Sequence, residues 1–420
     1  MAKVFPFKGW RYNSENIQSL EHVFVPPYDV ISPADQEQYY NLSSHSYIRI
    51  NLNKGSGSER YFSAANTLNM WIGSGVLVEE NLPAIYILSQ SFKVNGSMVD
   101  RISCICALKL SELGDTVLPH EQTIEKHLDD RYNLMESTAA NSGQIFMCYK
   151  DEQMVLETVY SDIKDDPFFS VDLDGVGYKL WPITDKEVIG KFVTGLADKI
   201  LVIADGHHRY KTALKYAKNH TSLKDSQQVM VTLVNSKNPG MQIMPTHRLL
   251  SGIDKSIEDI KKDVGTYFSV KEFTGADKLL SEIDMLDNPK SVLGLFHKES
   301  NTGLLLEFSA WDMLESRMAD KSKSLRELDT NILHSFLLKD VFNIDTNKQE
   351  DLKYLSYLRG NKPALKMLEK EENYDVVCFV SPPSLDDVFS IAESGETMPQ
   401  KSTYFFPKVY SGLVTRCINK

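Results

Sequence analysis

The stretch that decides the fold covers residues 200–214 and reads ILVIADGHHRYKTAL. Its first part, Leu201–Ala204, is a short unbroken apolar run, which is typical of a strand covered on both faces. From Thr212 onward, apolar residues recur at the spacing of a helix. The sequence therefore predicts a buried strand, a turn at Gly206 and a helix in direct succession.

The polar residues of this turn suit a phosphate site. His207, His208 and Arg209 fall at the predicted helix N-terminus, where backbone N–H groups and the helix dipole favour an anion. Arg209 adds a planar fork that matches phosphate oxygens. Asp205, at the end of the strand, can hold a metal ion or accept a proton. The alternative is a structural helix cap with solvated His and Arg side chains, and we favour the phosphate site.

This turn resembles the Asp-Gly-His-His-Arg motif of free serine kinases in the ParB/sulfiredoxin-like superfamily, in which a related turn holds nucleotide phosphates. The resemblance covers Asp205–Ala213. It implies a ParB/sulfiredoxin-like α/β unit, with ATP or ADP and Mg²⁺ as cofactors and free L-serine as the acceptor. In this interpretation Gly206–Arg209 bind the phosphates, Asp205 binds the metal, and Asp205 and His208 are catalytic.

A longer resemblance extends from one end of the chain to the other. Several blocks look like those of a prokaryotic family known as domain of unknown function ten-fifteen, and they occur in the family's order. Because this family carries no assigned activity, the function must be inferred from the motifs. The blocks are FPFKGWRYN at 5–13, VPPYDVIS at 25–32, PHEQT at 119–123, DR at 130–131, PTHR at 245–248 and GETMPQKST at 395–403.

A second group of polar residues lies upstream of the turn, in His120–Glu121 and Asp130–Arg131. Glu121 is a candidate catalytic base, and a helix-capping carboxylate is the equally weighted alternative. The spacing of His120 and His127 does not match an HExxH zinc motif, because these residues are not on adjacent helical turns.

Two later blocks supply candidate phosphate ligands. His247 and Arg248 offer two further cations, and the alternative is a strand-end turn with an exposed arginine. Lys401 lies in a near match to GxxxxGK[ST], but Gln400 replaces the second glycine and resists the phosphate-cradling geometry. We therefore reject a P-loop and keep Lys401 as a candidate ligand. The residues expected to converge on one cleft are Asp29, Glu121, Asp205, His247 and Lys401.

Composition narrows the class of protein. The 420 residues include 46 basic and 57 acidic ones, and the net charge of −11 argues against nucleic-acid or anionic-membrane binding. No apolar run approaches the roughly 20 residues that span a bilayer. The five cysteines show no CxxC pair, which favours reduced thiols in a cytoplasmic protein. Nothing in the sequence indicates an oligomeric state.

The predicted organisation is two α/β parts that meet near residue 225. Residues 1–225 are expected to form the ParB/sulfiredoxin-like unit, with an inserted hairpin that turns at Asn95–Gly96. Residues 226–420 are expected to form a C-terminal α/β unit that contributes to the same cleft. Apolar spacing further predicts strands at 23–25 and 48–52 and helices at 59–73 and 325–341.

These observations favour nucleotide-dependent phosphoryl transfer to a small hydroxyl-bearing metabolite, with free L-serine as the first candidate. One alternative is a nucleotide-binding switch that does not turn over. The other is a metal-dependent phosphatase or hydrolase built from histidines, namely His120, His207, His208 and His247.

Overall fold

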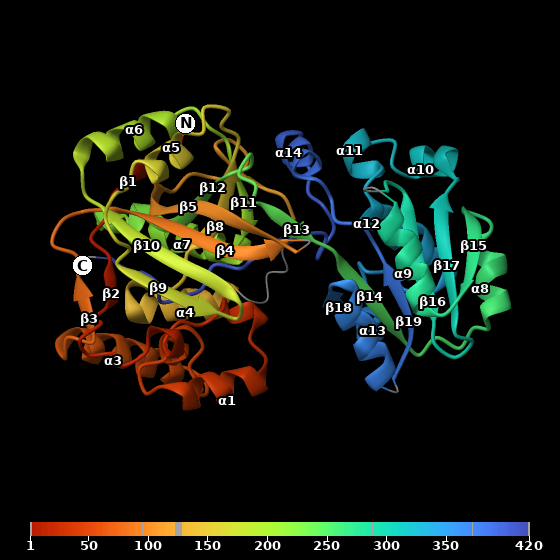
Figure 1. Ribbon diagram of the computed structural model, residues 1–420, viewed down its shortest axis with the longest axis horizontal. Helices are drawn as coiled ribbons and strands as arrows, with labels where there is room; N and C mark the ends of the chain where they lie inside the picture. Colours follow the sequence, from red (N-terminus) through yellow and green to blue (C-terminus); the bar gives the residue numbers. More distant parts are fainter. Residues whose placement is uncertain (1, 95, 122–127, 287–288, 372, 419–420) are drawn as a thin grey trace. The chain divides into compact units, whose positions relative to one another are not determined.

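The chain folds into two units, each built around its own sheet (Figure 1). The computed structural model describes residues 2–94, 96–121, 128–286, 289–371 and 373–418. The first unit comprises Met1–Pro119, Thr123–Gln242 and Pro407–Lys420, and the second comprises His120–Gln122 and Ile243–Phe406. This division differs from the expected boundary near residue 225, because strand β12 (Gln228–Asn235) is a central strand of the first sheet and the C-terminal segment returns to that unit.

The first unit contains a mixed sheet. Eight of its strands follow one path, and β1 (Val4–Phe5) pairs with β5 outside that path. In spatial order, the described strands of the path are β6 (Val117–Pro119), β11 (Leu201–Asp205), β8 (Ile145–Tyr149), β12, β5 (Ser97–Lys109), β4 (Ile85–Val94), β10 (Val176–Ile183) and β9 (Phe169–Leu173).

The core of this unit forms where helices pack on the apolar strands. Ile145, Met147, Leu201 and Ile203 are fully buried. They share one apolar cluster with side chains of four helices, which cover strands that are apolar on both faces. These helices are α4 (Leu128–Thr138), α5 (Val155–Ser161), α6 (Lys186–Leu196) and α7 (His207–Asn219).

The two strongest local predictions for this unit are confirmed. Strand β11 is followed by Gly206 and then directly by α7. Strands β4 and β5 form the expected hairpin, with Val94 opposite Ser97 and Gly96 at a φ of 84°. A positive φ at Gly96 is the backbone conformation that a tight hairpin turn requires.

The N-terminal region contains several helices, and one prediction made for it is wrong. The predicted helix at 59–73 is confirmed as α3 (Glu59–Gly73). The predicted strand at 48–52 is wrong, because this segment forms the single-turn helix α2 (Ile48–Asn51). Its residues Ile48, Ile50 and Asn51 are all buried, so the alternating apolar pattern does not mark one solvent-exposed and one buried face of a strand. Helix α1 (Pro33–Leu42) begins at a capping box.

The predicted strand at 23–25 is also wrong. A 3-10 helix (Leu20–His22) precedes it, and only Val25 makes a bridge, to Ser411. This single bridge nevertheless brings the block at 25–32 beside the C-terminal segment, within the first unit.

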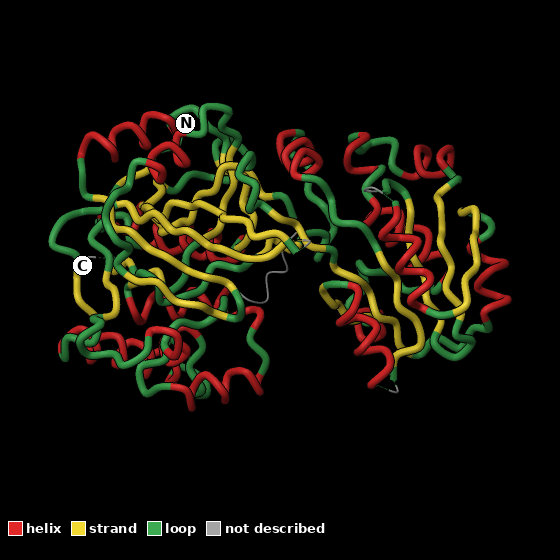
Figure 2. Tube along the Cα trace, in the orientation of Figure 1, coloured by secondary structure: helices red, strands yellow, loops and turns green. Residues whose placement is uncertain are grey.

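The second unit contains a six-stranded antiparallel sheet in its described part. Leu249 and Leu250 are adjacent on β14, and they belong to apolar clusters on opposite faces of the sheet. Helices cover both faces, as Figure 2 shows. The strand order is β15 (Phe268–Thr274), β17 (Thr302–Phe308), β16 (Val292–His297), β19 (Tyr374–Phe379), β14 (Thr246–Ser251) and β18 (Leu355–Arg359).

The continuous helix expected at 325–341 is interrupted. The segment instead contains α11 (Lys323–Arg326), α12 (Asp329–Ile332) and a π-helix (Leu333–Val341). At the break, Asp329 turns away to accept a hydrogen bond from the Ser291 N–H at 2.7 Å. A hydrogen bond to a residue distant in the sequence, next to the start of β16, therefore accompanies the break in the helix.

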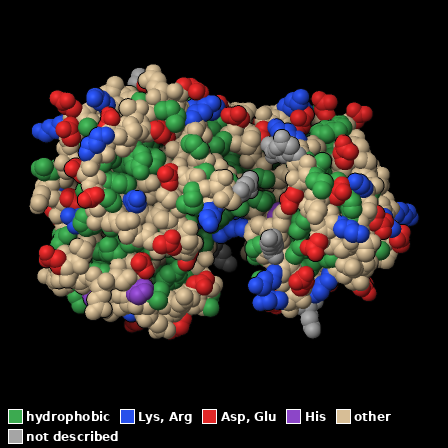
Figure 3. Space-filling model, in the orientation of Figure 1, with side chains coloured by type: hydrophobic (Ala, Val, Ile, Leu, Met, Phe, Trp, Pro, Cys, Tyr) green, Lys and Arg blue, Asp and Glu red, His purple; other side chains and the backbone are tan. Residues whose placement is uncertain are grey.

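Both units combine helices with sheets, so the predicted α/β class is confirmed. All five cysteines are free thiols. No helix in the described part of the chain has the length and apolar character needed to cross a bilayer. On the face shown in Figure 3, acidic and basic side chains are interspersed.

Candidate functional site

The turn between β11 and α7 has the backbone geometry of an anion site. Gly206 is the N-cap residue, and its φ of 96° and ψ of 29° place it in the left-handed region. A Cβ added there would lie 3.0 Å from the Arg209 Nε atom. The N-cap contributes no side-chain cap to α7, a helix of 13 residues whose N-terminal end carries positive potential.

Asp205 holds two cations at this turn. Its Oδ1 atom lies 2.5 Å from the Lys408 Nζ atom, and its Oδ2 atom lies 2.5 Å from the Arg209 Nη2 atom. Burial opposes ionisation of Asp205, but the charges of Lys408 and Arg209 outweigh burial and lower its pKa. The carboxylate is therefore ionised near neutral pH. This state suits metal binding or the positioning of cations better than proton abstraction.

Arg209 connects the turn to a second loop. Its Nη1 atom donates a hydrogen bond to the carbonyl oxygen of Gln144. A Cβ added at Gly143 would lie 3.4 Å from the same nitrogen and 3.3 Å from the Ser411 Oγ atom. The guanidinium is thus held between Asp205 at the turn and the loop at 143–144.

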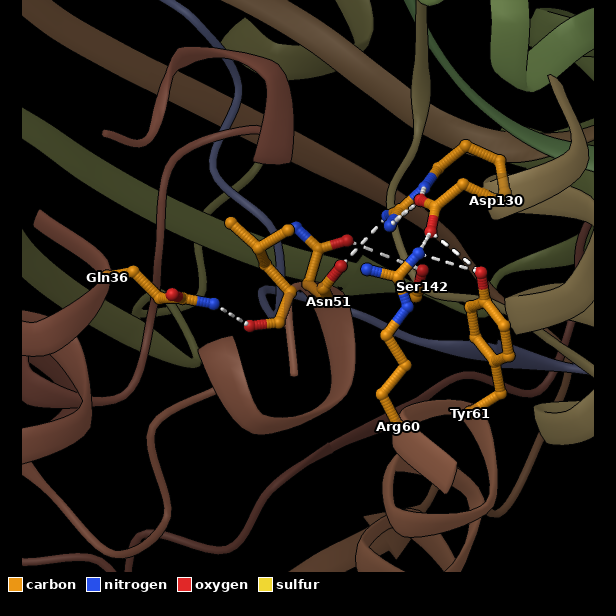
Figure 4. Close-up of polar contacts among 8 residues, drawn as sticks. Gln36, Asn51, Arg60, Tyr61, Asp130 and Ser142 are labelled. Carbon is orange, nitrogen blue, oxygen red and sulfur yellow. Dashed lines mark hydrogen bonds and ion pairs between the residues drawn. The ribbon is translucent and has the colours of Figure 1, made fainter. Parts of the chain in front are cut away.

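Asp130 repeats the pattern seen at Asp205, because it also holds two cations. Figure 4 shows the Arg60 guanidinium and the Tyr61 hydroxyl reaching the Asp130 carboxylate, and the Tyr61 hydroxyl donates to it at 2.9 Å. Arg131 is the second cation, and its Nε atom donates to Asp130 at 2.8 Å. Burial raises the pKa of Asp130, but Arg131 and its other partners lower it further, so the net shift is downward.

Arg131 and Tyr28 bring two sequence blocks together. The Arg131 guanidinium lies 4.0 Å from the centre of the Tyr28 ring, and its Nη1 atom donates to the Asn51 carbonyl oxygen at 2.8 Å. Burial raises the pKa of the Tyr28 hydroxyl against the opposing charges of Arg131 and Arg209. Tyr28 therefore lies near both guanidinium groups.

A small pocket lies among these residues and has a volume of about 40 Å³. Guanidinium, hydroxyl and amide groups line it, and none of the described residues that line it is acidic. The polar lining residues are Tyr28, Asn51, Arg131, Asn141, Ser142, Arg209, Thr212 and Ser411. Pocket, turn and ion pairs all belong to the first unit.

The remaining predicted residues group within the second unit. The Lys401 N–H donates to the Glu121 Oε1 atom at 3.0 Å, and the Arg248 Nη2 atom donates to the Lys401 carbonyl oxygen at 3.3 Å. Lys401 has a φ of 59°, a conformation that is uncommon outside glycine. Backbone contacts thus join three of the family blocks in this unit.

His247 and Arg248 lie on strand β14 and are both buried, so the alternative of a strand-end turn with an exposed arginine is wrong. Burial and the neighbouring Arg248 charge lower the pKa of His247 to about 4. The Arg248 Nη2 atom also lies 3.1 Å from the His334 Nε2 atom. This arginine is held by neutral partners and backbone carbonyls.

The structure thus places the predicted residues in two groups. Asp29, which is exposed, and Asp205–Arg209 belong to the first unit, whereas Glu121, His247 and Lys401 belong to the second. His207 and His208 are the first two residues of α7 and are half-buried. Among the described residues, no group of three or more His, Cys, Asp or Glu side chains is arranged to hold a metal ion.

Sequence reasoning assigned no role to three residues of the first-unit site, although it named Arg131 in the second polar group. Tyr28 and Arg131 lie inside the family blocks at 25–32 and 130–131, and their place in these blocks is a signal that could have identified them. Lys408 lies five residues beyond the last block, and nothing near it in sequence indicates that it pairs with Asp205.

Comparisons with known proteins give one family and several partial structural likenesses. A family described as protein of unknown function (DUF1015) matches residues 4–331. A free serine kinase variant in complex with ADP is 12% identical, with a TM-score of 0.36, over 69% of this chain and 84% of that chain. A conserved hypothetical protein from Pyrococcus furiosus is 12% identical, with a TM-score of 0.34, over 70% and 89%.

A third likeness is SbnI with a C-terminal truncation, from Staphylococcus aureus. It is 12% identical, with a TM-score of 0.32, over 72% of this chain and 79% of that chain. No match was found among curated proteins.

Proposed function

The chain belongs to the DUF1015 family, whose description assigns no activity, and we propose that it is a nucleotide-dependent phosphotransferase. Its acceptor is a small hydroxyl-bearing metabolite. Free L-serine is the first candidate because the Asp-Gly-His-His-Arg turn resembles that of free serine kinases.

The observation that carries this proposal is the ion-pair arrangement at the start of α7. Asp205 holds Arg209 and Lys408 beside a helix N-terminus that opens with a glycine in the left-handed region. Helix dipole, guanidinium and ammonium all favour an anion at this place. Because both cations are held before any ligand arrives, little reorganisation is needed to bind phosphate oxygens.

The proposed chemistry gives each residue one task. The acceptor hydroxyl attacks the terminal phosphorus, a new P–O bond forms, and the bond to the nucleotide's bridging oxygen breaks. Arg209, Lys408 and the first residues of α7 offset the charge on the transferred group. His208 takes the hydroxyl proton, and ionised Asp205 fixes the two cations. Asp205 is also the residue that would hold Mg²⁺, which would supply further positive charge to the phosphates.

For the second unit, the proposed roles are those expected from sequence. Glu121 is a candidate base, and His247, Arg248 and Lys401 are candidate phosphate ligands. Two features support this assignment: Lys401 contacts both Glu121 and Arg248, and within the described part of the chain the buried Arg248 side chain is hydrogen-bonded to neutral groups and not to a carboxylate.

The test combines nucleotide binding with product formation. Wild type, Arg209→Ala and Lys215→Ala are titrated with ADP and ATP by calorimetry, and ³¹P NMR follows transfer to L-serine. Arg209→Ala should weaken nucleotide binding by about 1.5–3 kcal/mol, the range for a hydrogen bond to a charged group. Lys215 is a control from the exposed face of the same helix.

Three outcomes separate the possible functions. Binding with product formation supports the phosphotransferase. Binding by wild type without turnover of any acceptor returns the protein to the nucleotide-switch alternative. Equal affinity of wild type and Arg209→Ala removes the turn from the nucleotide site.

A further inference from the structure

We infer that the pocket lined by Arg131 and Thr212 binds a carboxylate group of the acceptor, so that the substrate class is small hydroxy acids or hydroxy amino acids. This inference rests on the proposed function, because it assumes that the neighbouring β11–α7 turn holds the phosphates. It adds a second subsite with its own ligand chemistry.

Arg131 lines this pocket and has more N–H donors than the hydrogen bonds it makes to the described residues. Its side chain is 8% exposed, and its five N–H groups make three hydrogen bonds, two to Asp130 and one to the Asn51 carbonyl oxygen. Two N–H groups therefore remain without a partner among the described residues. A guanidinium is well matched to a carboxylate, which it binds through paired parallel hydrogen bonds.

Thr212 provides an independent sign of a ligand. Its side chain is 3% exposed and lines the pocket, yet its hydroxyl has no hydrogen-bond partner in the described structure. A buried hydroxyl without a partner is costly and is rare in proteins. A ligand oxygen in the pocket would satisfy it.

Other polar groups of the pocket form hydrogen bonds with one another. The Asn51 Nδ2 atom donates to the Ser411 Oγ atom at 3.2 Å, and the Ser142 Oγ atom donates to the Asn51 Oδ1 atom at 3.5 Å. Figure 4 shows Asn51 and Ser142 next to the Asp130 network. Asn51 and Ser411 are nearly inaccessible to solvent, so the wall of the pocket is set before a ligand binds.

The charges around the pocket favour an anion. Asp130 and Asp205 each hold two cations, namely Arg60 with Arg131 and Lys408 with Arg209. These four cations and two carboxylates leave a surplus of two positive charges. A phosphoryl group at the turn and a carboxylate in the pocket would both be attracted by that surplus.

The size of the pocket decides which anion it takes. A volume of about 40 Å³ admits a group of a few atoms and excludes a whole nucleotide. Because the helix N-terminus and Lys408 already suit phosphate at the turn, the flat Arg131 fork is left for the planar group of the acceptor.

The experiment uses Thr212→Val and Arg131→Lys in the full chain. Thr212→Val keeps the side-chain shape and removes only the hydroxyl, so the free protein should be no less stable than wild type. Affinity for L-serine should fall about tenfold in Thr212→Val, as expected for loss of one hydrogen bond to a charged group. Arg131→Lys keeps the charge and loses the fork, and it should weaken L-serine binding at least as much.

Binding is measured by calorimetry with L-serine, ethanolamine and inorganic phosphate, each with and without ADP. Ethanolamine shares the amine and hydroxyl of serine and lacks the carboxylate, so it should bind much more weakly to wild type. The inference is overturned if ethanolamine binds as well as L-serine, if Thr212→Val leaves L-serine affinity unchanged, or if inorganic phosphate competes with L-serine for this pocket.

Failure of the proposed function would look different. Wild type would then show no ADP binding at the turn, while the L-serine titration without ADP would still report on the Arg131 pocket. Loss of ADP affinity with unchanged L-serine affinity in Thr212→Val would contradict the inference and leave the proposed function standing.

Discussion

Asp205 and Lys408 lie 203 residues apart in the chain and form an ion pair of 2.5 Å. The pair fixes the C-terminal segment against the turn that begins α7. Both side chains are largely buried, so the attraction acts in a medium with less screening than water. The cation that helps to define the candidate site therefore comes from the end of the chain.

Replacing Lys408 with methionine should damage both stability and binding. Asp205 would lose one of its two ion-pair partners, and breaking a buried pair costs about 3–5 kcal/mol. Urea unfolding should show this loss, and calorimetry should show weaker ADP binding. Lys215→Met removes an exposed ion pair with Asp129 on the same helix as Arg209 and should cost less than about 1 kcal/mol. Unchanged ADP affinity in Lys408→Met would remove Lys408 from the site.

Gly206→Ala should be destabilising for two separate reasons. The φ of 96° is unfavourable for a residue with a Cβ, and that Cβ would meet the Arg209 guanidinium at 3.0 Å. The backbone effect alone costs about 1–2 kcal/mol. Gly57→Ala is the matched control, since Gly57 has a φ of 55° and no atom within 4 Å of the added Cβ.

The control separates backbone strain from the contact with Arg209. Thermal unfolding should show a loss for both variants, and only Gly206→Ala should also weaken ADP binding. If the two variants behave alike in both measurements, the close approach of Gly206 to Arg209 makes no contribution to ADP binding.

Acidification should destabilise the second unit through His247. Its pKa in the folded chain is about 4, below the usual 6.5, because it is buried beside Arg248. The unfolded chain therefore binds more protons between pH 6.5 and 4. Stability is fully present above pH 6.5 and falls as the pH drops toward 4, by up to about 3 kcal/mol.

Unfolding of His247→Gln across this pH range checks that prediction. The variant should lose less stability than wild type between pH 6.5 and 4.5, since its amide does not titrate. His22→Gln, at an exposed position, is the control. A wild-type slope that persists unchanged in His247→Gln would assign the effect to other groups.

Asp329→Asn should stabilise the protein at alkaline pH. Burial raises the pKa of Asp329 to about 7, whereas the unfolded group ionises near 3.8. The protonated Asp329 carboxyl therefore contributes fully to the free energy of unfolding below pH 3.8. This contribution is lost as the pH rises through 7, and the loss reaches about 4 kcal/mol.

Asparagine does not ionise and keeps an acceptor for the Ser291 N–H. Asp329→Asn should melt at a higher temperature than wild type at pH 8, and the difference should shrink at pH 5. An equal difference at both pH values would show that packing, and not ionisation, is responsible.

Local signals in the sequence predicted the parts of the fold that depend on neighbouring residues. The strand before Gly206, the helix after it and the hairpin at Gly96 each follow from apolar spacing combined with the backbone freedom of one glycine. The segment at 48–52 failed because five alternating residues also fit one buried helical turn. The segment at 325–341 failed because the helix is interrupted where Asp329 bonds to Ser291, a residue distant in the sequence.

The candidate site was predictable only where its residues are local. The motif at Asp205–Arg209 is contiguous, so its geometry followed from the strand and helix that it joins. Tyr28, Arg131 and Lys408 come from separate segments, and their contacts depend on tertiary packing. One sequence shows that such residues exist, and it does not show which of them meet.

The most direct test of the central claim is a crystal structure of the full chain grown with ADP. The account predicts phosphate oxygens within hydrogen-bond distance of the first N–H groups of α7, with Arg209 and Lys408 as their charged neighbours. Phosphates bound elsewhere in the chain, with the turn from Asp205 to Arg209 empty, would contradict it.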